Sequence, residues 1–387
     1  MVLPALLAVA AATAADAAEP ELRTWTDING RRIEASLKSR EDTAVVLTLE
    51  NGREVKVPLE SLSADDREWL AQNVTDGGSP GYDGPPAEAD WPRTVSQSEP
   101  PKARITREDR ERREFVYETE HYEFICDSQL GINVVRDFSR VFEATWLANC
   151  LLPLELKPVP EPGREKFQAR LFTDAGDYLK NGGLPGSAGI YSGEGKSMML
   201  PIDSVGVRMF GSRVTVDPAA NDYNTLIHEI THQMMNRWLG RIPIWFAEGS
   251  AEYVAIAKFD NGRFSFVQQD RQLKEYLSRH SSGVFSMVPL ESLMTIDART
   301  WSTSLENDGF WRYYLSALVL TYYFYHLDGD GKGTHIKAFM RAIENPDAGS
   351  GDGAVKEHLL RDRDYATLQS DVQKAMRRLG IALTFEE

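Results

Sequence analysis

The feature that most constrains this chain of 387 residues is the pentapeptide His228-Glu229-Ile230-Thr231-His232. Histidines four positions apart project from one face of a helix, one turn apart, so both imidazoles can reach a single metal ion. The carboxylate of Glu229, beside the first histidine, can then act on a water molecule bound to that metal. The pentapeptide therefore predicts a helix that carries two metal ligands and a base.

The residues around the pentapeptide are typical of a buried helix. Asn221 and Asp222 offer an N-cap before it, and Gly240 and Pro243 provide stop signals after it. Residues at helical spacing form a core-facing stripe: Ile227, Ile230, Thr231, Met234 and Trp238. The alternative is that both histidines are core residues satisfied by ordinary hydrogen bonds. The rarity of this motif in a chain with 7 histidines favours the metal site.

A second apolar segment supplies the candidate third ligand. Residues 243–256 are apolar on nearly all sides of a helix, and their only side chains that can ionise to carboxylates are Glu248 and Glu252. A buried carboxylate requires a partner, which a metal ion or a metal-bound histidine provides. We expect Glu248 to be the third ligand, and Glu252 to accept the free ring N–H of a ligand histidine, in the first place His228.

The two acids have an alternative arrangement. Glu248 and Glu252 could instead pair with arginines such as Arg241 or Arg312. In the metal-site arrangement, two histidines and one glutamate leave a coordination position open, as in catalytic zinc sites, whereas structural zinc sites fill all four positions. The predicted chemistry is then hydrolysis, because zinc lowers the pKa of bound water to about 7 and polarises a carbonyl while Glu229 moves the proton.

Taken together, the two segments resemble the gluzincin metallopeptidases, in the peptidase MA-like group. The resemblance rests on His228-Glu229-x-x-His232 followed by Trp-Phe-x-Glu-Gly-x-Ala-Glu-Tyr at 245–253, and it is concentrated in residues 223–256. It implies that the three predicted ligands bind Zn²⁺ and that Glu229 is the general base. The substrate that it implies is a peptide or protein, cleaved at a peptide bond.

Gluzincins also carry a downstream tyrosine that hydrogen-bonds the oxyanion formed in the reaction. The run FWRYY at 310–314 offers two candidates, Tyr314 ahead of Tyr313. Aromatic residues at helical spacing throughout 310–325 are also typical of an apolar core. The alternative is therefore that both tyrosines only contribute to packing.

Residues 22–72 have a different pattern, which predicts a small antiparallel barrel. Asn29-Gly30 and Asn51-Gly52 favour tight hairpin turns. The expected strands are 22–25, 32–37, 43–49 and 54–59, followed by a helical turn at 65–72. The segment resembles the Sla homology domain, an SH3-like barrel, through RTWT at 23–26 and VPLESLS at 57–63. Eukaryotic relatives of that domain bind short peptides, so a peptide or cell-surface ligand of the barrel stays open.

The chain is expected to have four parts. Residues 1–18 are rich in Leu, Val and Ala and contain A-x-A patterns, which are typical of a cleaved signal peptide and predict a periplasmic or extracellular protein. A simple Ala-rich tail is the alternative, since no Lys or Arg precedes the apolar stretch. The barrel at 22–72 is followed by a linker at 73–112, whose charged end at 104–114 we interpret as a solvated helix face. A metallopeptidase domain is expected at 113–387.

The fold class expected for the metallopeptidase domain is α+β, with a twisted sheet, then a helical lobe, and zinc between them. Strands are expected at 114–126, 167–172, 188–192 and 197–202, and a helix at 133–151. The last two strands form a hairpin before the pentapeptide. We expect its exposed edge to pair with an extended peptide through an outward N–H of Met198 or Leu200. The alternative is an ordinary surface meander.

Composition limits the partners and leaves two other functions open. The net charge of −15 argues against nucleic acid, because phosphate binding requires basic patches. Cys126 and Cys150 could pair after export or remain buried thiols. The chain could be a catalytically silent zinc-binding scaffold, against which the intact Glu229 argues, or a peptide-binding protein that acts through its barrel. The oligomeric state and the cleaved sequence are not set by these patterns.

Overall fold

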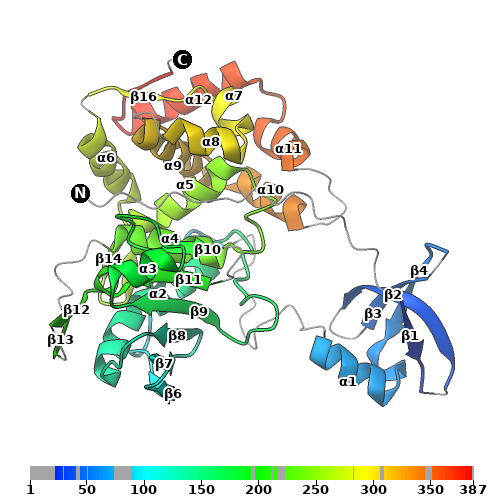
Figure 1. Cartoon of the computed structure of the whole chain (residues 1–387). Coiled ribbons are helices and arrows are strands. Elements are labelled where there is room, and N and C mark those ends of the chain that lie inside the picture. Colours follow the sequence, from blue (N-terminus) through cyan, green and yellow to red (C-terminus); the bar gives the residue numbers. More distant parts are fainter. Residues whose placement is uncertain are drawn as a thin grey trace. The chain divides into compact units, whose positions relative to one another are not determined.

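Figure 1 shows the computed structural model of the chain, which has two compact units, one within residues 12–82 and one within residues 83–387. The residues that the structure describes are 22–28, 30–40, 44–49, 51–73, 89–192, 197–210, 213–216, 223–281, 283–305, 309–344 and 351–385. The predicted signal peptide at 1–18 and the N-cap residues Asn221 and Asp222 lie outside them. Within these ranges, no helix is long and apolar enough to cross a membrane.

The smaller unit is an antiparallel sheet followed by a helix. Its elements are β1 (Arg23–Thr26), β2 (Arg32–Arg40), β3 (Ala44–Leu49), β4 (Glu54–Pro58), the 3₁₀-helix η1 (Leu59–Ser61) and α1 (Ala64–Asn73), with strand order β1-β2-β3-β4. The Trp25 ring lies in the core, and its N–H donates to the carbonyl of Ala35 at 3.0 Å. The predicted strands are confirmed. β2 is longer than expected because a bulge between Leu37 and Ser39 lets pairing continue.

The larger unit is built on a six-stranded sheet of order β10-β11-β9-β8-β7-β6. The strands are β6 (Arg104–Asp109), β7 (Glu114–Glu118), β8 (Tyr122–Cys126), β9 (Phe167–Phe172), β10 (Ile190–Ser192) and β11 (Ser197–Pro201). Helix α2 (Ile132–Leu151) packs on the sheet through aromatic rings. The ring centroids of Phe138 and Phe124 are 5.1 Å apart, and so are those of Phe142 and Tyr122. Cys126 and Cys150 are both buried free thiols.

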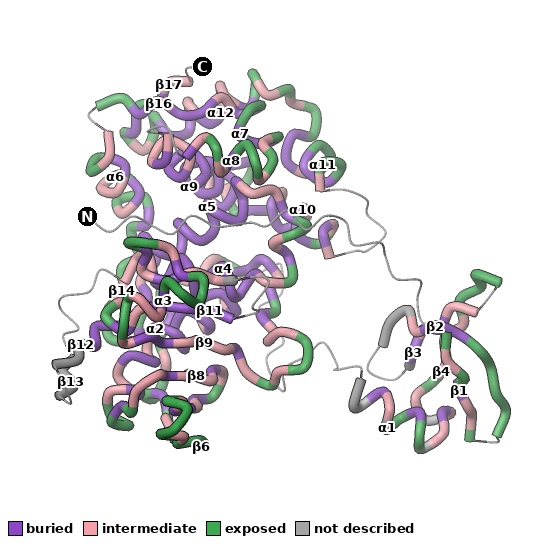
Figure 2. The backbone as a smooth tube through the Cα atoms, viewed as in Figure 1, coloured by how far each residue is buried: buried purple, intermediate pink, exposed green. Residues whose placement is uncertain are grey.

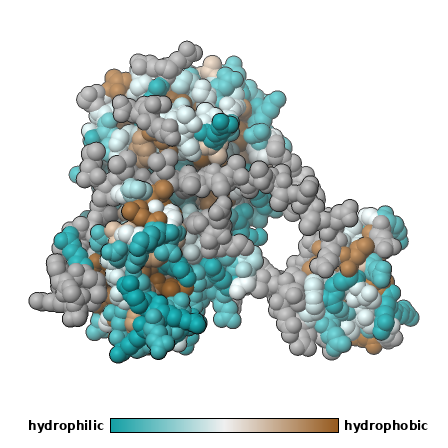
Figure 3. Space-filling view, in the orientation of Figure 1, coloured by the Kyte–Doolittle hydropathy of each residue, from teal (hydrophilic) through white to brown (hydrophobic). Residues whose placement is uncertain are grey.

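The charged run at 104–114 forms the strand β6 and the turn into β7, so its interpretation as a helix face is wrong. β6 pairs antiparallel with β7, and Arg104 forms an ion pair with Glu118 at 2.8 Å across the two strands. Arg107 is similarly paired with Glu114. Cross-strand pairs of opposite charge stabilise an edge strand whose side chains are exposed except for the partly buried Asp109. Figure 3 shows hydrophilic residues gathered over the part of this unit where Figure 1 places β6 to β8.

The predicted linker at 73–112 is wrong in its second half, because residues from about 89 onward pack against the larger unit. β5 (Thr94–Ser96) pairs with β15 (Arg263–Ser265), which pairs with β14 (Lys258–Asp260). The Trp91 ring stacks on Tyr325 with centroids 4.4 Å apart, and its N–H donates to the Lys332 carbonyl at 3.2 Å. The Gly, Pro and Ser residues around Trp91 are typical of a linker, so the sequence did not predict that this ring anchors the segment.

A helical lobe follows the sheet, so the expected mixed helix-and-sheet chain with a small N-terminal sheet is confirmed. Its longer helices are α4 (Asn224–Met234), α5 (Ile244–Ala255), α6 (Gln269–His280), α9 (Phe310–His326), α10 (Thr334–Glu344) and α12 (Tyr365–Arg378). Shorter helices are α3 (Ala175–Lys180), η2 (Ile202–Val205), α7 (Leu290–Thr295), α8 (Ala298–Ser304), α11 (Gly351–Ala354) and the π-helical η5 (Val355–Leu360). Two small sheets pair β12 (Val207–Phe210) with β13 (Arg213–Val216) and β16 (Phe285–Met287) with β17 (Leu383–Phe385).

Helix α5 is the centre of this lobe, and it packs on both α4 and α9 (Figure 2). Gly249 permits the close approach to α9, because a Cβ atom there would lie 2.3 Å from the carbonyl oxygen of Ala317 and 2.2 Å from Oγ1 of Thr321. The side chain of Ser250 also contacts α9, with its oxygen 3.0 Å from the Tyr325 hydroxyl. These contacts fix the position of the neighbouring residue, Glu248.

Candidate metal centre

Helices α4 and α5 bring three buried side chains to one point. His228 Nε2 lies 2.9 Å from His232 Nε2 and 3.2 Å from Glu248 Oε2. The third side of this triangle, from His232 Nε2 to Glu248 Oε2, measures 3.3 Å. The exposed fractions of the three residues are 2%, 0% and 0%. The structure thus brings together the three residues that the sequence predicts as metal ligands.

The dimensions and chemistry of this triangle fit a small divalent cation. Ligand atoms about 2.0–2.1 Å from a tetrahedral metal are about 3.3 Å from one another. Two imidazole nitrogens in mutual contact can share at most one proton. Hydrogen bonds alone therefore satisfy the three atoms of this cluster poorly. Glu248 Oε1 and Glu229 Oε1 are buried with no hydrogen-bond partner among the described residues. A cation and its bound water would satisfy oxygens of this kind.

Glu252 lies where the sequence predicts it, behind the first histidine. Its Oε1 is 3.0 Å from His228 Nδ1, and its exposed fraction is 4%. When Nδ1 carries the proton, the lone pair of Nε2 points to the common centre. The ion-pair partners of both acids are histidines rather than the alternative arginines. Arg241 donates to the carbonyl of Ile343, and Arg312 to that of Met287.

Glu229 lies beside the ligands on α4 and has an exposed fraction of 1%. The backbone N–H of Tyr191, on β10, donates to its Oε2 at 3.3 Å. Burial raises the pKa of Glu229 to about 8, and the charge of Glu248 adds to the increase, whereas the charge of His228 lowers the pKa. A dication nearby would oppose this increase, because it favours the charged carboxylate.

The ligand residues influence one another's protonation. Burial opposes the charged form of His228, but hydrogen bonds and charge from Glu248 and Glu252 raise its pKa well above the usual value. Burial lowers the pKa of His232. Burial works against the charged form of Glu248, but both histidines lower its pKa to about 2. Glu248 is therefore ionised, as a metal ligand must be, whereas a metal ion that binds here would displace the Nε2 proton of His228.

Tyr314, on α9, lies beside the cluster. The ring centroid of Tyr314 is 5.9 Å from that of His228. Burial, together with the charges of Glu248 and Glu229, raises the pKa of the Tyr314 phenol well above its usual value, which keeps it a hydrogen-bond donor. Both tyrosines pack on Trp301, with ring centroids 5.5 Å (Tyr313) and 5.6 Å (Tyr314) away, but among the described ring contacts only that of Tyr314 reaches a ligand histidine.

The predicted substrate edge is assigned to the wrong strand. β11 lies between β10 and β9 and pairs with both, so Met198 and Leu200 have no outward edge to offer. Met198 and Met199 are both buried. The edge strand is β10, whose Tyr191 N–H points to Glu229. The hairpin itself is confirmed, while its connecting residues 193–196 lie outside the described part of the chain.

Sequence reasoning did not find the residues that fasten β10 to α4. The Tyr191 hydroxyl donates to Oε1 of Glu161, and Asn236 Nδ2 donates to the same atom at 3.1 Å. These side chains are distant in sequence, so no spacing rule connects them. Tyr191 and Asn236 lie in or next to segments already identified, the hairpin and the pentapeptide helix, whereas Glu161 lies between α2 and β9 and carries no signal of its own.

Comparison with known proteins identifies the smaller unit and not the larger one. The family model of SLA1 homology domain 1 matches residues 14–76, which agrees with the predicted Sla-type, SH3-like domain at the N-terminus. No curated protein matches the chain. The class of the larger unit therefore has to be argued from its site.

Proposed function

We propose that residues 113–387, with the preceding segment from about 89, form a zincin-like, zinc-dependent peptidase. The convergence of His228 Nε2, His232 Nε2 and Glu248 Oε2 within 3.3 Å of one another carries the proposal. Two imidazoles and one carboxylate are the ligand set of catalytic zinc sites that keep a position for water. A carboxylate next to that position, here Glu229, is what hydrolysis requires in addition.

Each residue of the site then has a role that its position supports. When bound, zinc would activate water and polarise the scissile carbonyl. Glu229 takes the proton of the attacking water and delivers it to the leaving amine, while the Tyr191 N–H holds its carboxylate in place. Glu252 holds His228 in one tautomer. The Tyr314 phenol donates a hydrogen bond to the developing oxyanion.

The N-terminal unit supports a second, separate role. The match to SLA1 homology domain 1 at residues 14–76 makes it a candidate module for binding a peptide or a surface ligand. Export to the periplasm or the cell exterior, suggested by the apolar residues 1–18, is part of the same proposal. A protein of this kind would deliver a peptidase to the ligand of its barrel.

Metal analysis combined with peptide cleavage tests the peptidase. The full chain should hold about one zinc ion, and His228→Ala, His232→Ala and Glu248→Ala should each lose most of it, whereas His358→Ala, on the distant η5, should not. Glu229→Gln should keep zinc and lose about 10²–10⁴-fold in turnover. Full zinc content in all three ligand variants would refute the centre. A zinc-loaded protein that cleaves no member of a peptide library would leave only the scaffold function.

A further inference from the structure

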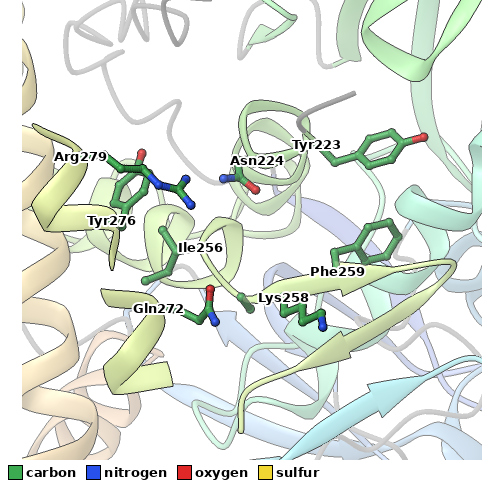
Figure 4. A pocket seen from close by; sticks show the side chains of 9 residues that line it. Tyr223, Asn224, Ile256, Lys258, Phe259, Gln272, Tyr276 and Arg279 are labelled. Atoms are coloured by element: carbon green, nitrogen blue, oxygen red, sulfur yellow. The ribbon is translucent and has the colours of Figure 1, made fainter. Parts of the chain in front are cut away.

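A pocket of about 380 Å³ lies at the junction of α4, α5 and α6 (Figure 4). Asn224, on its wall, precedes His228 by one helical turn, and Ile256 follows Glu252 by one turn. Residues one turn apart share a helix face. The pocket therefore lies on the faces of α4 and α5 that carry the candidate ligands, about 6 Å from His228 along α4 and about 12 Å from Glu248 along α5.

The pocket is positively charged within an acidic protein. Lys258, on β14, and Arg279, on α6, line it, and none of the described lining residues is acidic, although the chain has a net charge of −15. The N-terminal end of α4 and the C-terminal end of α5 both border it, so their helix dipoles oppose each other. The side chains of Lys258 and Arg279 therefore give the pocket its positive charge.

The remaining polar groups of the wall are neutral hydrogen-bond donors. Asn224 and Gln272 carry amides, and Tyr223 and Tyr276 carry phenols. In Figure 4 the side chains of Arg279 and Asn224 point toward one another, so a guanidinium and an amide face the same space. A guanidinium matches the geometry of a carboxylate because it offers two parallel N–H donors.

We infer that this pocket binds a carboxylate of the substrate and so makes the enzyme selective for acidic peptides. The inference rests on the proposed peptidase function. An extended peptide advances about 3.3 Å per residue. The carboxylate bound by Arg279 and Lys258 therefore lies within about four residues of the cleaved bond. It is either an Asp or Glu side chain or the C-terminal carboxylate of the peptide.

Paired peptides test the inference in the full-length, zinc-loaded protein. One set carries Glu or Gln at each position near the cleaved bond, and the other carries a free or an amidated C-terminus, so the two sets separate the sources of the carboxylate. One set should show a preference of about tenfold or more in kcat/KM for the carboxylate. Equal rates within every pair would overturn the inference.

Variants assign the preference to the pocket. In the double variant Arg279→Gln/Lys258→Gln, the ratio of kcat/KM between the two peptides of the preferred pair should fall to about one. The variant Arg279→Lys, which keeps the charge, should retain part of this preference. Arg271→Gln removes an exposed cation from the same helix outside the pocket and should leave the ratio unchanged. An unchanged ratio in the double variant, with its fold intact by circular dichroism, would place the selectivity elsewhere and overturn the assignment.

A binding measurement separates this inference from the proposed function. Calorimetry with Glu229→Gln, which keeps the ligands but lacks the base, should give a Kd about tenfold or more lower for the carboxylate member of the pair. A binding preference without turnover by wild type would refute the peptidase and support the pocket. Turnover with equal Kd values would overturn the pocket and support the peptidase.

Discussion

Glu252 Oε1 lies 3.0 Å from Nδ1 of His228, on the side of the imidazole away from His232 and Glu248. In the proposed zinc site, this carboxylate would therefore act through a ligand rather than as one. Glu252→Gln should reduce zinc affinity or activity about 10–100-fold, because the ring loses a charged acceptor but keeps its position. Competition with a chelator measures the affinity. Glu275→Gln, on the exposed face of α6, is the control, and equal losses in both variants would contradict the role of Glu252.

Removing the metal should destabilise the larger unit, since the ligands join α4 to α5. At a free zinc concentration about 1,000 times Kd, binding stabilises the folded state by about 4 kcal/mol. A chelator should therefore lower Tm, and added Zn²⁺ should restore it. His232→Ala should have the same low Tm with or without zinc. A chelator effect that persists in this variant would mean that the metal binds elsewhere.

Gly249→Ala should be strongly destabilising, because the new methyl group would overlap the backbone of α9 at Ala317. Overpacking of this kind costs about 1–3 kcal/mol or more, and here it also displaces Glu248. We expect a lower Tm together with weaker zinc binding. Gly353→Ala is the matched control, since its Cβ meets no atom within 4 Å. A wild-type Tm for Gly249→Ala would show that α5 and α9 are less closely packed.

A proline at position 191 should slow the chemical step. β10 is the edge strand, and its Tyr191 N–H donates to Oε2 of Glu229, the proposed base, at 3.3 Å. Proline removes this donor. Tyr191→Pro should lower kcat several-fold more than Tyr191→Ala, which loses the ring but keeps the N–H, with the zinc content of both unchanged. Equal kcat values in the two variants would show that this N–H does not position Glu229.

His326 should make stability depend on pH. Burial lowers its pKa to about 4, below the value of about 6.5 expected when the chain is unfolded. Between these values the unfolded chain binds more protons, so stability falls as pH decreases from about 6.5 to 4, by at most about 3 kcal/mol. His326→Gln can keep a hydrogen bond to Tyr253 and does not titrate in this range. Urea unfolding should show a smaller loss at low pH in this variant.

The cluster of His228, His232 and Glu248 could be predicted from sequence because its determinants are local. The spacing of His228 and His232 and the lone acids of an apolar helix each follow from helix geometry within a dozen residues. Tyr314 came from a family resemblance, since its own surroundings are those of a core aromatic. Which tyrosine faces the ligands depends on how α9 packs on α5, and spacing alone does not set this.

The incorrect predictions concern contacts between distant segments. The edge position of β10 follows from the parallel pairing of β11 with β9, which no local pattern of Met198 or Leu200 encodes. The two arginines of β6 pair with acids on β7, so the sequence of β6 by itself is equally compatible with a helix. In both places tertiary pairing decides the structure, because local propensity is nearly neutral.

The position of Trp91 has a consequence for separating the parts of this protein. Its ring covers Tyr325 and lies 4.9 Å from His326, so the residues just before the sheet complete the wall of the helical lobe. A shortened chain that begins at 113, where the sequence places the boundary, would expose these aromatic rings to water and lose the partner strand of β15. A fragment that begins near residue 89 keeps the wall intact and should be the smallest one to fold alone.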